Sequence, residues 1–351
     1  MLFGWRGDPE SNTLAPEVVD LHARTLTLDT HVDIRWPDPP DPATDGPMRV
    51  DFPKMARGGL RAVTFIAYVP QARRDEAGHA AAAARAEAML RHIRSRADGT
   101  ARRFCATAEE LEAAHAAGAT GILSAVENGY AMGHDLSAPA RWRALGACYL
   151  TLTHDGHNAL ADSARPKPLL GDTQSEHGGL SPLGRQAIAA LNAAGIMVDC
   201  SHVSKAGMMQ AAEVSRSPVV VTHTACRTLC DHPRNLDDEQ LDILRDVGGV
   251  AQITAVPAFL RKVPDGAVNP ASVEDLANHV DHAVRRIGIE HVGLSSDFDG
   301  GGGIGGWQNA AESAALTAEL LARGYDARAV SLLWSGNFLR AWRRAAEVAA
   351  G

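Results

Sequence analysis

Residues 26–34, LTLDTHVDI, form an apolar run that ends in two polar side chains. His31 and Asp33 stand two positions apart, and residues i and i+2 of a β-strand lie on the same face. The two side chains therefore either form an ordinary surface pair beyond a strand or share one binding partner. The remainder of the sequence decides between these interpretations.

Eight short runs rich in β-branched and apolar residues recur along the chain, and each is followed by a segment of helical composition. The predicted strands span residues 25–30, 61–69, 120–125, 147–153, 196–201, 218–222, 249–254 and 291–296. Strands that alternate with helices indicate a parallel sheet, and eight of them favour an α/β fold of the closed (β/α)8 TIM-barrel type. An open doubly wound sheet is less favoured, because no GxGxxG segment follows the first strand. The glycines at 300–303 are interpreted as a flexible loop.

The helical segments carry their own boundary signals. Ser181 followed by Pro182 is typical of a helix start, and Gly195 is typical of a helix end. We expect a single domain over residues 1–351, with an N-terminal arm over about 1–24 and C-terminal helices over about 309–349. The predicted helices span residues 75–97, 107–116, 138–145, 182–194, 204–215, 237–246, 272–287, 309–323 and 327–349.

Six of the eight predicted strands end in histidine, aspartate or glutamate. The active site of a (β/α)8 barrel lies at the carboxyl ends of its strands, so these side chains would meet at one mouth. A single terminal histidine is usually a hydrogen-bonded cap, but this set would require six unrelated caps. The residues are His31, Asp33, Glu127, His154, His202, His223 and Asp297.

Imidazole and carboxylate groups without thiolates are ligands that suit Zn²⁺ and similar ions. The set holds more ligands than one tetrahedral ion needs, and Glu127 could bridge two ions with one oxygen on each. Two ions roughly 3.5–4 Å apart can share a hydroxide and polarise a carbonyl or phosphoryl oxygen. This chemistry indicates a hydrolase, without naming the bond that it cleaves.

The composition argues against several classes of protein. A net charge of −8 without a basic block argues against a nucleic-acid surface and against an anionic membrane partner. The first residues, MLFGWRGDPESN, lack the apolar core of a secretory signal, and no apolar stretch is long enough to span a bilayer. Five cysteines without a CxxC pair predict free thiols in a reducing cytoplasm.

Several segments then point to one family by their order and spacing. They are DTHVDI, ENG, LTH, GLSPLG, GIMVDCSHVS, PVVVTHTACRTLCDHPRNLDD, HVGLSSDFDG and GNFLR, between about residues 27 and 340. Together they resemble the membrane (renal) dipeptidase family, a branch of the amidohydrolase superfamily. The resemblance implies a (β/α)8 barrel with a binuclear zinc site that hydrolyses dipeptides.

The resemblance also implies metal-binding roles for five residues. His31 and Asp33 match the ligands of the first ion. His202 and His223 match the ligands of the second ion. Glu127 matches the carboxylate that bridges the two.

Three further residues match groups that act on the substrate. His154 matches the histidine that contacts the substrate and the tetrahedral intermediate, and Arg234 matches the arginine that contacts bound substrate. Asp297 matches the acid that shuttles the proton. The expected substrate is a dipeptide, including one with a D-residue at its C-terminal position. The alternatives are a related amidohydrolase acting on another small amide or lactone, such as a β-lactam or an N-acyl amino acid, and a non-catalytic barrel, which would need a broken metal set.

Some features depart from the family or fall outside its motifs. Neither a membrane anchor nor disulfides are indicated here, so a homodimer is an expectation from the family alone. Thr254 and Ala255 stand where the family often has an Asn-aromatic pair, which bears on the pocket wall. The segment SGNFLR is expected to pack near the last strand.

Four polar residues near the predicted mouth have no assigned catalytic role. Asp29 has the parity of His31 and is expected deeper in the barrel, behind the ligands. His157, His177 and Asp299 are expected to order loops rather than to bind metal.

Overall fold

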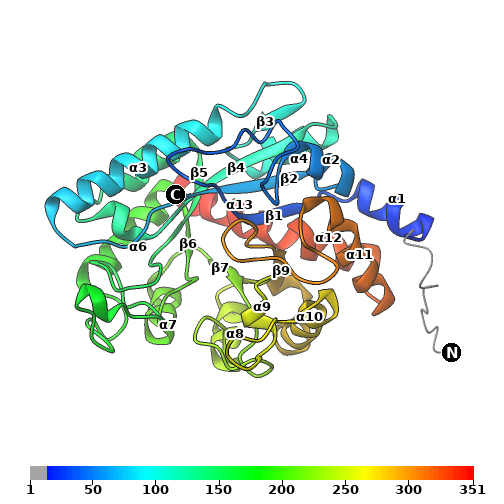
Figure 1. Ribbon diagram of the computed structural model, residues 1–351. Coiled ribbons are helices and arrows are strands. Elements are labelled where there is room, and N and C mark those ends of the chain that lie inside the picture. The colour runs from blue at the N-terminus through cyan, green and yellow to red at the C-terminus, as the bar shows by residue number, and fades with distance from the viewer. Residues whose placement is uncertain (1–13) are drawn as a thin grey trace.

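The computed structural model describes residues 14–351 and shows a nearly closed barrel of parallel strands with helices around it (Figure 1). Eight strands follow one another in hydrogen-bonded order, and the predicted (β/α)8 TIM-barrel class is confirmed. The strands are β1 (Leu28–Asp33), β2 (Ala62–Tyr68), β4 (Thr120–Glu127), β5 (Ala147–Thr151), β6 (Met197–Asp199), β7 (Val219–Thr224), β8 (Val250–Thr254) and β9 (Val292–Ser295). A ninth strand, β3 (Arg102–Phe104), pairs with the start of β4.

The barrel closes between β9 and β1 at its carboxyl end. The backbone N–H of Asp33 donates to the carbonyl of Phe298 at 3.0 Å, and the N–H of Asp297 donates to the carbonyl of His31 at 3.1 Å. These bonds join the first strand to the residues directly after the last one. The closure therefore fixes the spacing of three predicted site residues.

Three of the predicted strands extend further than the sequence indicated. β1, β4 and β7 run through His31, Glu127 and His223, which were placed beyond the strand ends. The predicted strands stop before these residues because strands in a core are normally apolar. Here these polar side chains are buried within the strands, so their positions are set by the sheet itself.

Helices cover the outside of the barrel between the strands. Ser181 caps one of them by accepting from the N–H of Gly184, and Gly195 ends it in the left-handed conformation, as predicted. The helices are α2 (Phe52–Gly58), α3 (Glu76–Arg94), α4 (Ala108–Ala116), α5 (Ala138–Leu145), α6 (Pro182–Ala194), α7 (Lys205–Val214), α8 (Asp238–Asp246), α9 (Pro257–Leu260), α10 (Val273–Ile287) and α11 (Ser313–Ala322).

The sequence did not predict some short elements. The described part of the N-terminal arm contains α1 (Pro16–Arg24), which packs against α11, and the first thirteen residues lie outside the described part. The helices α2 and α9 and the strand β3 were also missed. None of the helices in residues 14–351 is both long and apolar enough to cross a membrane.

The predicted last helix is divided by a wider turn. It consists of α12 (Ala327–Ser331), a π-helical turn (Leu332–Gly336) and α13 (Asn337–Ala350). The turn lets Trp334 donate to the hydroxyl of Thr317 on α11 at 2.9 Å, while Phe338 enters the barrel interior. In an uninterrupted α-helix these two positions, four apart, would share one face.

The C-terminal helix α13 closes the floor of the barrel. Phe338 and Trp342 join the interior apolar cluster, and the ring of Phe338 meets Tyr149 edge-on at 6.4 Å. The amide of Asn337 donates to the carbonyls of Ile289 at 2.6 Å and Val292 at 2.8 Å. The expectation that the SGNFLR segment packs near the last strand is therefore confirmed.

Strand β1 contains an irregularity that reverses one expectation. Asp29 pairs with Val63, but Val32 pairs with Phe65, so three residues of β1 advance against two of β2. Such a bulge shifts the alternation of side chains by one position. Asp29 therefore lies on the face of Val32, toward the surrounding helices, and the prediction that it shares the face of His31 inside the barrel is wrong.

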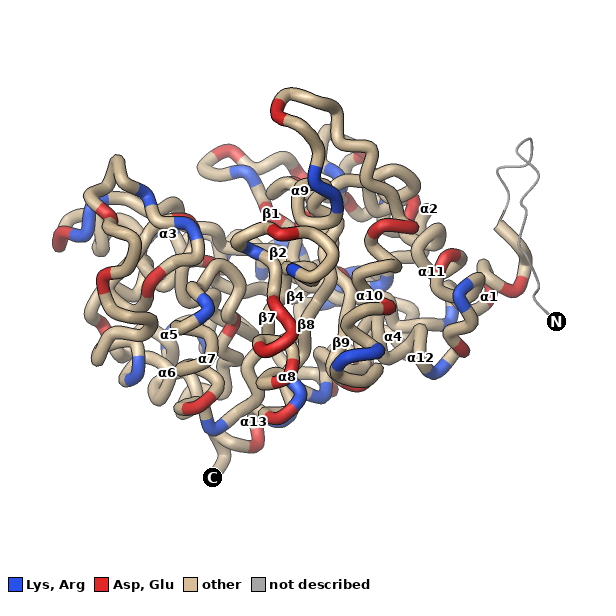
Figure 2. Tube along the Cα trace, turned by 90° about the horizontal axis from the view of Figure 1, so that it is seen from below, with Lys and Arg blue, Asp and Glu red and all other residues tan. Residues whose placement is uncertain are grey.

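Charged residues of both signs are interspersed along the chain (Figure 2). Several join neighbouring helices, as Arg343 of α13 does with Glu109 of α4 at 3.0 Å and Arg323 with Asp281 of α10 at 2.7 Å. The five cysteines are free and buried, in agreement with the prediction of free thiols.

We expect Asn337→Leu to lower the free energy of unfolding by about 1–3 kcal/mol, because two buried carbonyls lose their shared donor. Asn337→Asp removes the same donor and should be at least as destabilising. The exposed Asn278→Leu on α10 is the matched control and should be near neutral. Urea unfolding monitored by circular dichroism tests this, and an unchanged midpoint for both Asn337 variants would contradict it.

Candidate metal centre

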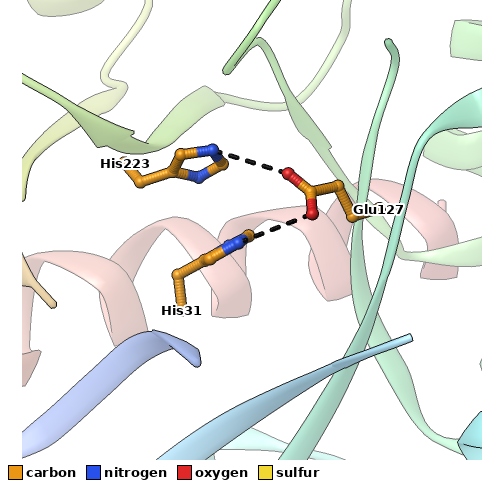
Figure 3. A group of neighbouring side chains, drawn as sticks. All are labelled: His31, Glu127 and His223. Carbon is orange, nitrogen blue, oxygen red and sulfur yellow. Dashed lines mark ion pairs between the residues drawn. The ribbon is translucent and has the colours of Figure 1, made fainter. Parts of the chain in front are cut away.

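Glu127, the last residue of β4, lies at the centre of the barrel mouth with its side chain 2% exposed. Its Oε2 atom is 3.7 Å from Nε2 of His31. Its Oε1 atom is 3.3 Å from Nε2 of His202 and 3.5 Å from Nε2 of His223. Figure 3 shows Glu127 facing His31 and His223 across the mouth. The two oxygens of one carboxylate thus point to different histidines.

The other predicted residues surround this group. The ring of His154 lies 4.0 Å from that of His202, and the rings of His31 and His223 are 3.9 Å apart. Two groups of three side chains could each hold a metal ion, because the ligand atoms within each group lie within 4.8 Å of one another. Both groups include Glu127. The groups are His31, Glu127 and His223, and Glu127, His154 and His202.

Asp33 and Asp297 lie side by side at the edge of the group. A side-chain carbon at Gly300 would come within 2.4 Å of Oδ2 of Asp33 and of Oδ1 of Asp297. Only glycine can therefore follow this turn so closely. The glycines at 300–303, interpreted as a flexible loop, in part serve to let the backbone pass these carboxylates.

The electrostatics of this group favour a bound cation. Burial, reinforced by the charges of Asp33 and Asp297, raises the pKa of Glu127 well above its usual range, and burial raises the pKa of Asp33 to about 7. Burial lowers the pKa of His31, His202 and His223 well below its usual range, so these rings are neutral. The neutral imidazoles are in the state that a metal ion requires, and a bound cation would replace the protons that the crowded carboxyl groups otherwise retain.

Two carboxylate oxygens of this group are buried and have no hydrogen-bond partner among the described residues. They are Oε1 of Glu127 and Oδ1 of Asp33. An unpaired buried carboxylate oxygen carries a large desolvation cost unless a ligand or ion binds it. The donor set, the neutral histidines and these unpaired oxygens together fit a metal centre of nitrogen and oxygen ligands.

Hydrogen bonds orient each of the three histidine rings at Nδ1. The hydroxyl of Tyr149 donates to the carbonyl of Thr30 at 2.8 Å, so its oxygen accepts from Nδ1–H of His31 at 2.9 Å. The hydroxyl of Thr222 likewise donates to Asp199 at 2.8 Å and accepts from Nδ1–H of His223 at 3.1 Å. In both rings the lone pair of Nε2 is left to face Glu127.

The third ring is held by a carboxylate. Nδ1 of His202 lies 3.3 Å from Oδ1 of Asp155, whose other oxygen is 3.3 Å from Arg165. A carboxylate on the far nitrogen fixes the tautomer and makes the imidazole a better ligand.

Asp199 anchors three strands behind these rings. Its carboxylate accepts from the hydroxyl of Thr151 on β5 at 2.6 Å and from the hydroxyl of Thr222 on β7 at 2.8 Å. It also accepts from the N–H and the hydroxyl of Ser201. The network keeps β5, β6 and β7 in register where their side chains reach the mouth.

Two site residues have unusual backbone angles. His202 has φ of 67° and Asp297 has φ of 58°, in the left-handed region that side chains rarely adopt. Strain of this kind is concentrated at functional sites, where the surrounding structure enforces it. Here it turns both side chains into the mouth directly after their strands.

Arg234 is a buried cation without a carboxylate partner within 4.0 Å in the described part of the chain. Its guanidinium makes only long contacts of 3.4 and 3.5 Å to the carbonyl of His223, and its Nε has no partner there. Burial lowers its pKa to about 10, so it remains charged at neutral pH. A buried arginine in this state favours an anionic ligand.

An aromatic ring supports Arg234 from an unexpected position. Phe259 on α9 lies 5.3 Å from the guanidinium carbon. Thr254 and Ala255, where the family pattern places an aromatic residue, are fully buried in this chain. The aromatic side chain beside Arg234 thus comes from Phe259, four residues after the position at which the family pattern places one.

The remaining polar residues of the sequence analysis have structural partners. His157 accepts from the N–H of Ser163, and Nε2 of His177 lies 2.9 Å from the carbonyl of Asn158. Asp299 accepts from the N–H of Arg49 at 3.0 Å. Asp29 accepts from the N–H groups of His31 and Ser296, which links β1 to the end of β9.

Sequence reasoning missed four residues that shape the site: Tyr68, Tyr149, Asp155 and Asp199. Tyr68 is the last residue of β2, one of the two strands that were not expected to end in histidine, aspartate or glutamate. Its ring lies 4.8 Å from that of His154. An acid inside the apolar strand MVD was the available signal for Asp199. No local pattern identifies Tyr149 or Asp155, because their roles depend on which strands meet.

Known proteins resemble this chain over most of its length. Dipeptidase tcpJ of Claviceps purpurea (strain 20.1) is 30% identical over 344 residues, covering 94% of this chain and 76% of that protein. Dipeptidase 3 of Mus musculus is 31% identical over 260 residues, covering 70% of this chain and 50% of that protein.

A solved structure, that of the probable dipeptidase PvdM from Pseudomonas aeruginosa, matches with a TM-score of 0.88 at 28% identity, covering 95% of this chain and 98% of that one. A metallo peptidase from Rhodobacter sphaeroides, liganded with a phosphinate mimic of the dipeptide L-Ala-D-Ala, matches with a TM-score of 0.77 at 27% identity, covering 92% and 99%.

The family model that matches this sequence describes membrane dipeptidase, peptidase family M19, and it extends over residues 16–351. Because that match covers nearly the whole chain, the protein belongs to the M19 dipeptidase family and is a hydrolase of peptide bonds.

Proposed function

We propose that this chain is a zinc-dependent dipeptidase with two ions bridged by Glu127. The observation that carries the proposal is the orientation of this carboxylate, with Oε2 toward His31 and Oε1 toward His202 and His223. His31 and Asp33 would hold one ion, and His202 and His223 would hold the other. His223 also lies close to His31, and its assignment to the second ion follows from its contact with Oε1.

Two bound Zn²⁺ ions supply an acidified water and an electrophile for the scissile carbonyl. Asp297 would hold the proton of that water and deliver it to the leaving amine. Burial and the charge of Asp33 raise its pKa well above the usual range, which supports this role. His154 has a pKa lowered by burial to about 3, and its buried Nδ1 has no partner in residues 14–351. A neutral imidazole has one N–H group, which it can donate to an oxyanion.

The charged groups of the site support a dipeptide as substrate. Arg234 would bind the terminal carboxylate, while the carboxylates at the metal centre lie within reach of a free amine. The related Rhodobacter sphaeroides enzyme bound a mimic of L-Ala-D-Ala, which favours acceptance of a D-residue at the second position. An assay of L-Ala-L-Ala and L-Ala-D-Ala beside a β-lactam and an N-acyl amino acid tests the substrate class.

We expect the zinc-loaded protein to hydrolyse these dipeptides and Glu127→Ala to lose at least about a thousandfold in kcat/KM, because both ions lose a ligand. Metal analysis should show fewer than two zinc ions per chain in the variant. Glu347→Ala, exposed on α13, is the control. A Glu127→Ala protein that keeps two ions and near-normal turnover would exclude the bridging role.

Arg234→Met should raise KM for dipeptides by about thirtyfold, since a charge-assisted contact to the substrate carboxylate is lost. Zinc content should remain at the wild-type level, because Arg234 is not a proposed ligand. Arg227→Met on the same loop, where Arg227 pairs with the exposed Asp231, is the matched control. Unchanged kinetics for Arg234→Met would remove this residue from the substrate site.

Metal removal should expose the repulsion among the carboxylates. Burial raises the pKa of Asp33 to about 7 in the folded protein. Its contribution to the free energy of unfolding is therefore fully present below about pH 4 and is lost as the pH rises toward 7. In metal-free protein, we therefore expect Asp33→Asn to become more stable than wild type over this range. Excess zinc should reverse the order. A difference in melting temperature that does not vary with pH would contradict this account.

A further inference from the structure

A cavity of about 510 Å³ opens beside the metal centre between the ends of β1 and β2. Asp33 and Gly300 form its inner wall, so it is continuous with the reaction site. Apolar side chains from the loop after β1, among them Trp36 and Met48, form its outer wall. Nothing in the proposed mechanism uses this space.

Tyr68 connects the cavity to the catalytic group. Its ring packs 4.8 Å from His154 and also lines the cavity. Its carbonyl accepts from Nε of Arg85, on α3, at 3.0 Å. The arginine is thereby held at the cavity wall by the same residue that contacts the proposed catalytic histidine.

Arg85 is a half-buried cation that lacks an acidic partner within 4.0 Å in residues 14–351. Its contact with Tyr68 uses Nε alone, which leaves both terminal nitrogens of the guanidinium for a ligand. Arg91, one and a half turns further along α3, instead pairs with Glu87 at 2.7 Å. The third arginine of this helix, Arg94, lies over the ring of Phe104 at 5.2 Å. Of the three, Arg85 is the one that lines the cavity.

The acids of the cavity do not neutralise Arg85. Asp33 is a proposed zinc ligand, and Asp299 accepts from the backbone N–H groups of Arg49 and Val50. Arg35 adds a second cation to the wall, with a loose contact of 3.9 Å to the exposed Asp38. The cavity therefore offers positive charge around an apolar space.

The order of the strands assigns the cavity to one end of the substrate. β2 and β7 are four places apart in the ring of eight strands and so face each other across the mouth. Arg234 lies against the end of β7, and the cavity lies at the end of β2. A dipeptide with its carboxylate at Arg234 would extend across the mouth toward this cavity, with its N-terminal residue on the side of Arg85.

We propose that Arg85 and this cavity select substrates with an acidic N-terminal residue, through a charge-assisted contact between the guanidinium and the side-chain carboxylate. Arg85 is then a specificity-determining residue that takes no part in bond cleavage. The proposal rests on the proposed dipeptidase function and names a substrate class within it.

The test compares kcat/KM for L-Glu-L-Ala and L-Gln-L-Ala, which have the same shape and differ in charge. Wild type should prefer L-Glu-L-Ala by about tenfold, the size expected for one charge-assisted contact. Arg85→Gln, which can still donate to the Tyr68 carbonyl, should abolish the preference and leave L-Gln-L-Ala turnover and zinc content unchanged. Arg85→Glu should shift the preference to L-Lys-L-Ala. Arg91→Met is the control on the same helix and should behave as wild type.

Equal rates for the two substrates in wild type, or a preference that survives in Arg85→Gln, would overturn the role of Arg85. Cleavage of L-Gln-L-Ala under those conditions would leave the dipeptidase proposal intact. If the zinc-loaded protein cleaves neither dipeptide nor the alanine dipeptides, the proposed function fails, and the cavity assignment fails with it.

Discussion

The crowding of Asp33, Glu127 and Asp297 at one barrel mouth is the constraint on which the rest of the site depends. Burial raises the pKa of each carboxyl group. The charge of Asp33 adds to this effect at Glu127 and Asp297, and the charge of Asp299 adds to it at Asp33. Three acids in this arrangement oppose folding unless cations or protons offset their charge. The neighbouring imidazoles are neutral, so the three acids favour a bound cation. The buried cation of Arg234 favours an anionic ligand beside it.

The barrel provides the rigidity that such a group needs. His31 is held by Tyr149, whose ring also packs on Phe338 at the floor, so a contact chain runs from the closing helix to the mouth. His223 is held through Thr222 by Asp199, which ties three strands together. Because Tyr149, Thr222 and Asp199 belong to strands, the sheet sets the spacing of these imidazole rings.

The sequence predicted the strands and the residue types at their ends because both are local properties. Hydrophobic alternation marks a strand, and His31, Glu127, His202 and His223 follow directly from where the alternation stops. Asp29 was misplaced because a bulge in β1 changes the parity, and no feature of that segment alone reveals it.

The supporting residues were missed for a related reason. Tyr149 and Asp155 act on histidines of other strands, and such pairs depend on how the strands are staggered. The same holds for Arg85, because the position of its guanidinium beside Tyr68 depends on how α3 packs against β2. The residues proposed to hold the ions are thus easier to predict than those that orient them or those proposed to select the substrate.

The closure of the floor by α13 has a consequence for how the chain folds. Phe338 and Trp342 complete the interior of the barrel, yet they follow all eight strands in the sequence. The contacts that close the floor therefore join residues far apart in the sequence, and contacts of such long separation form slowly during folding.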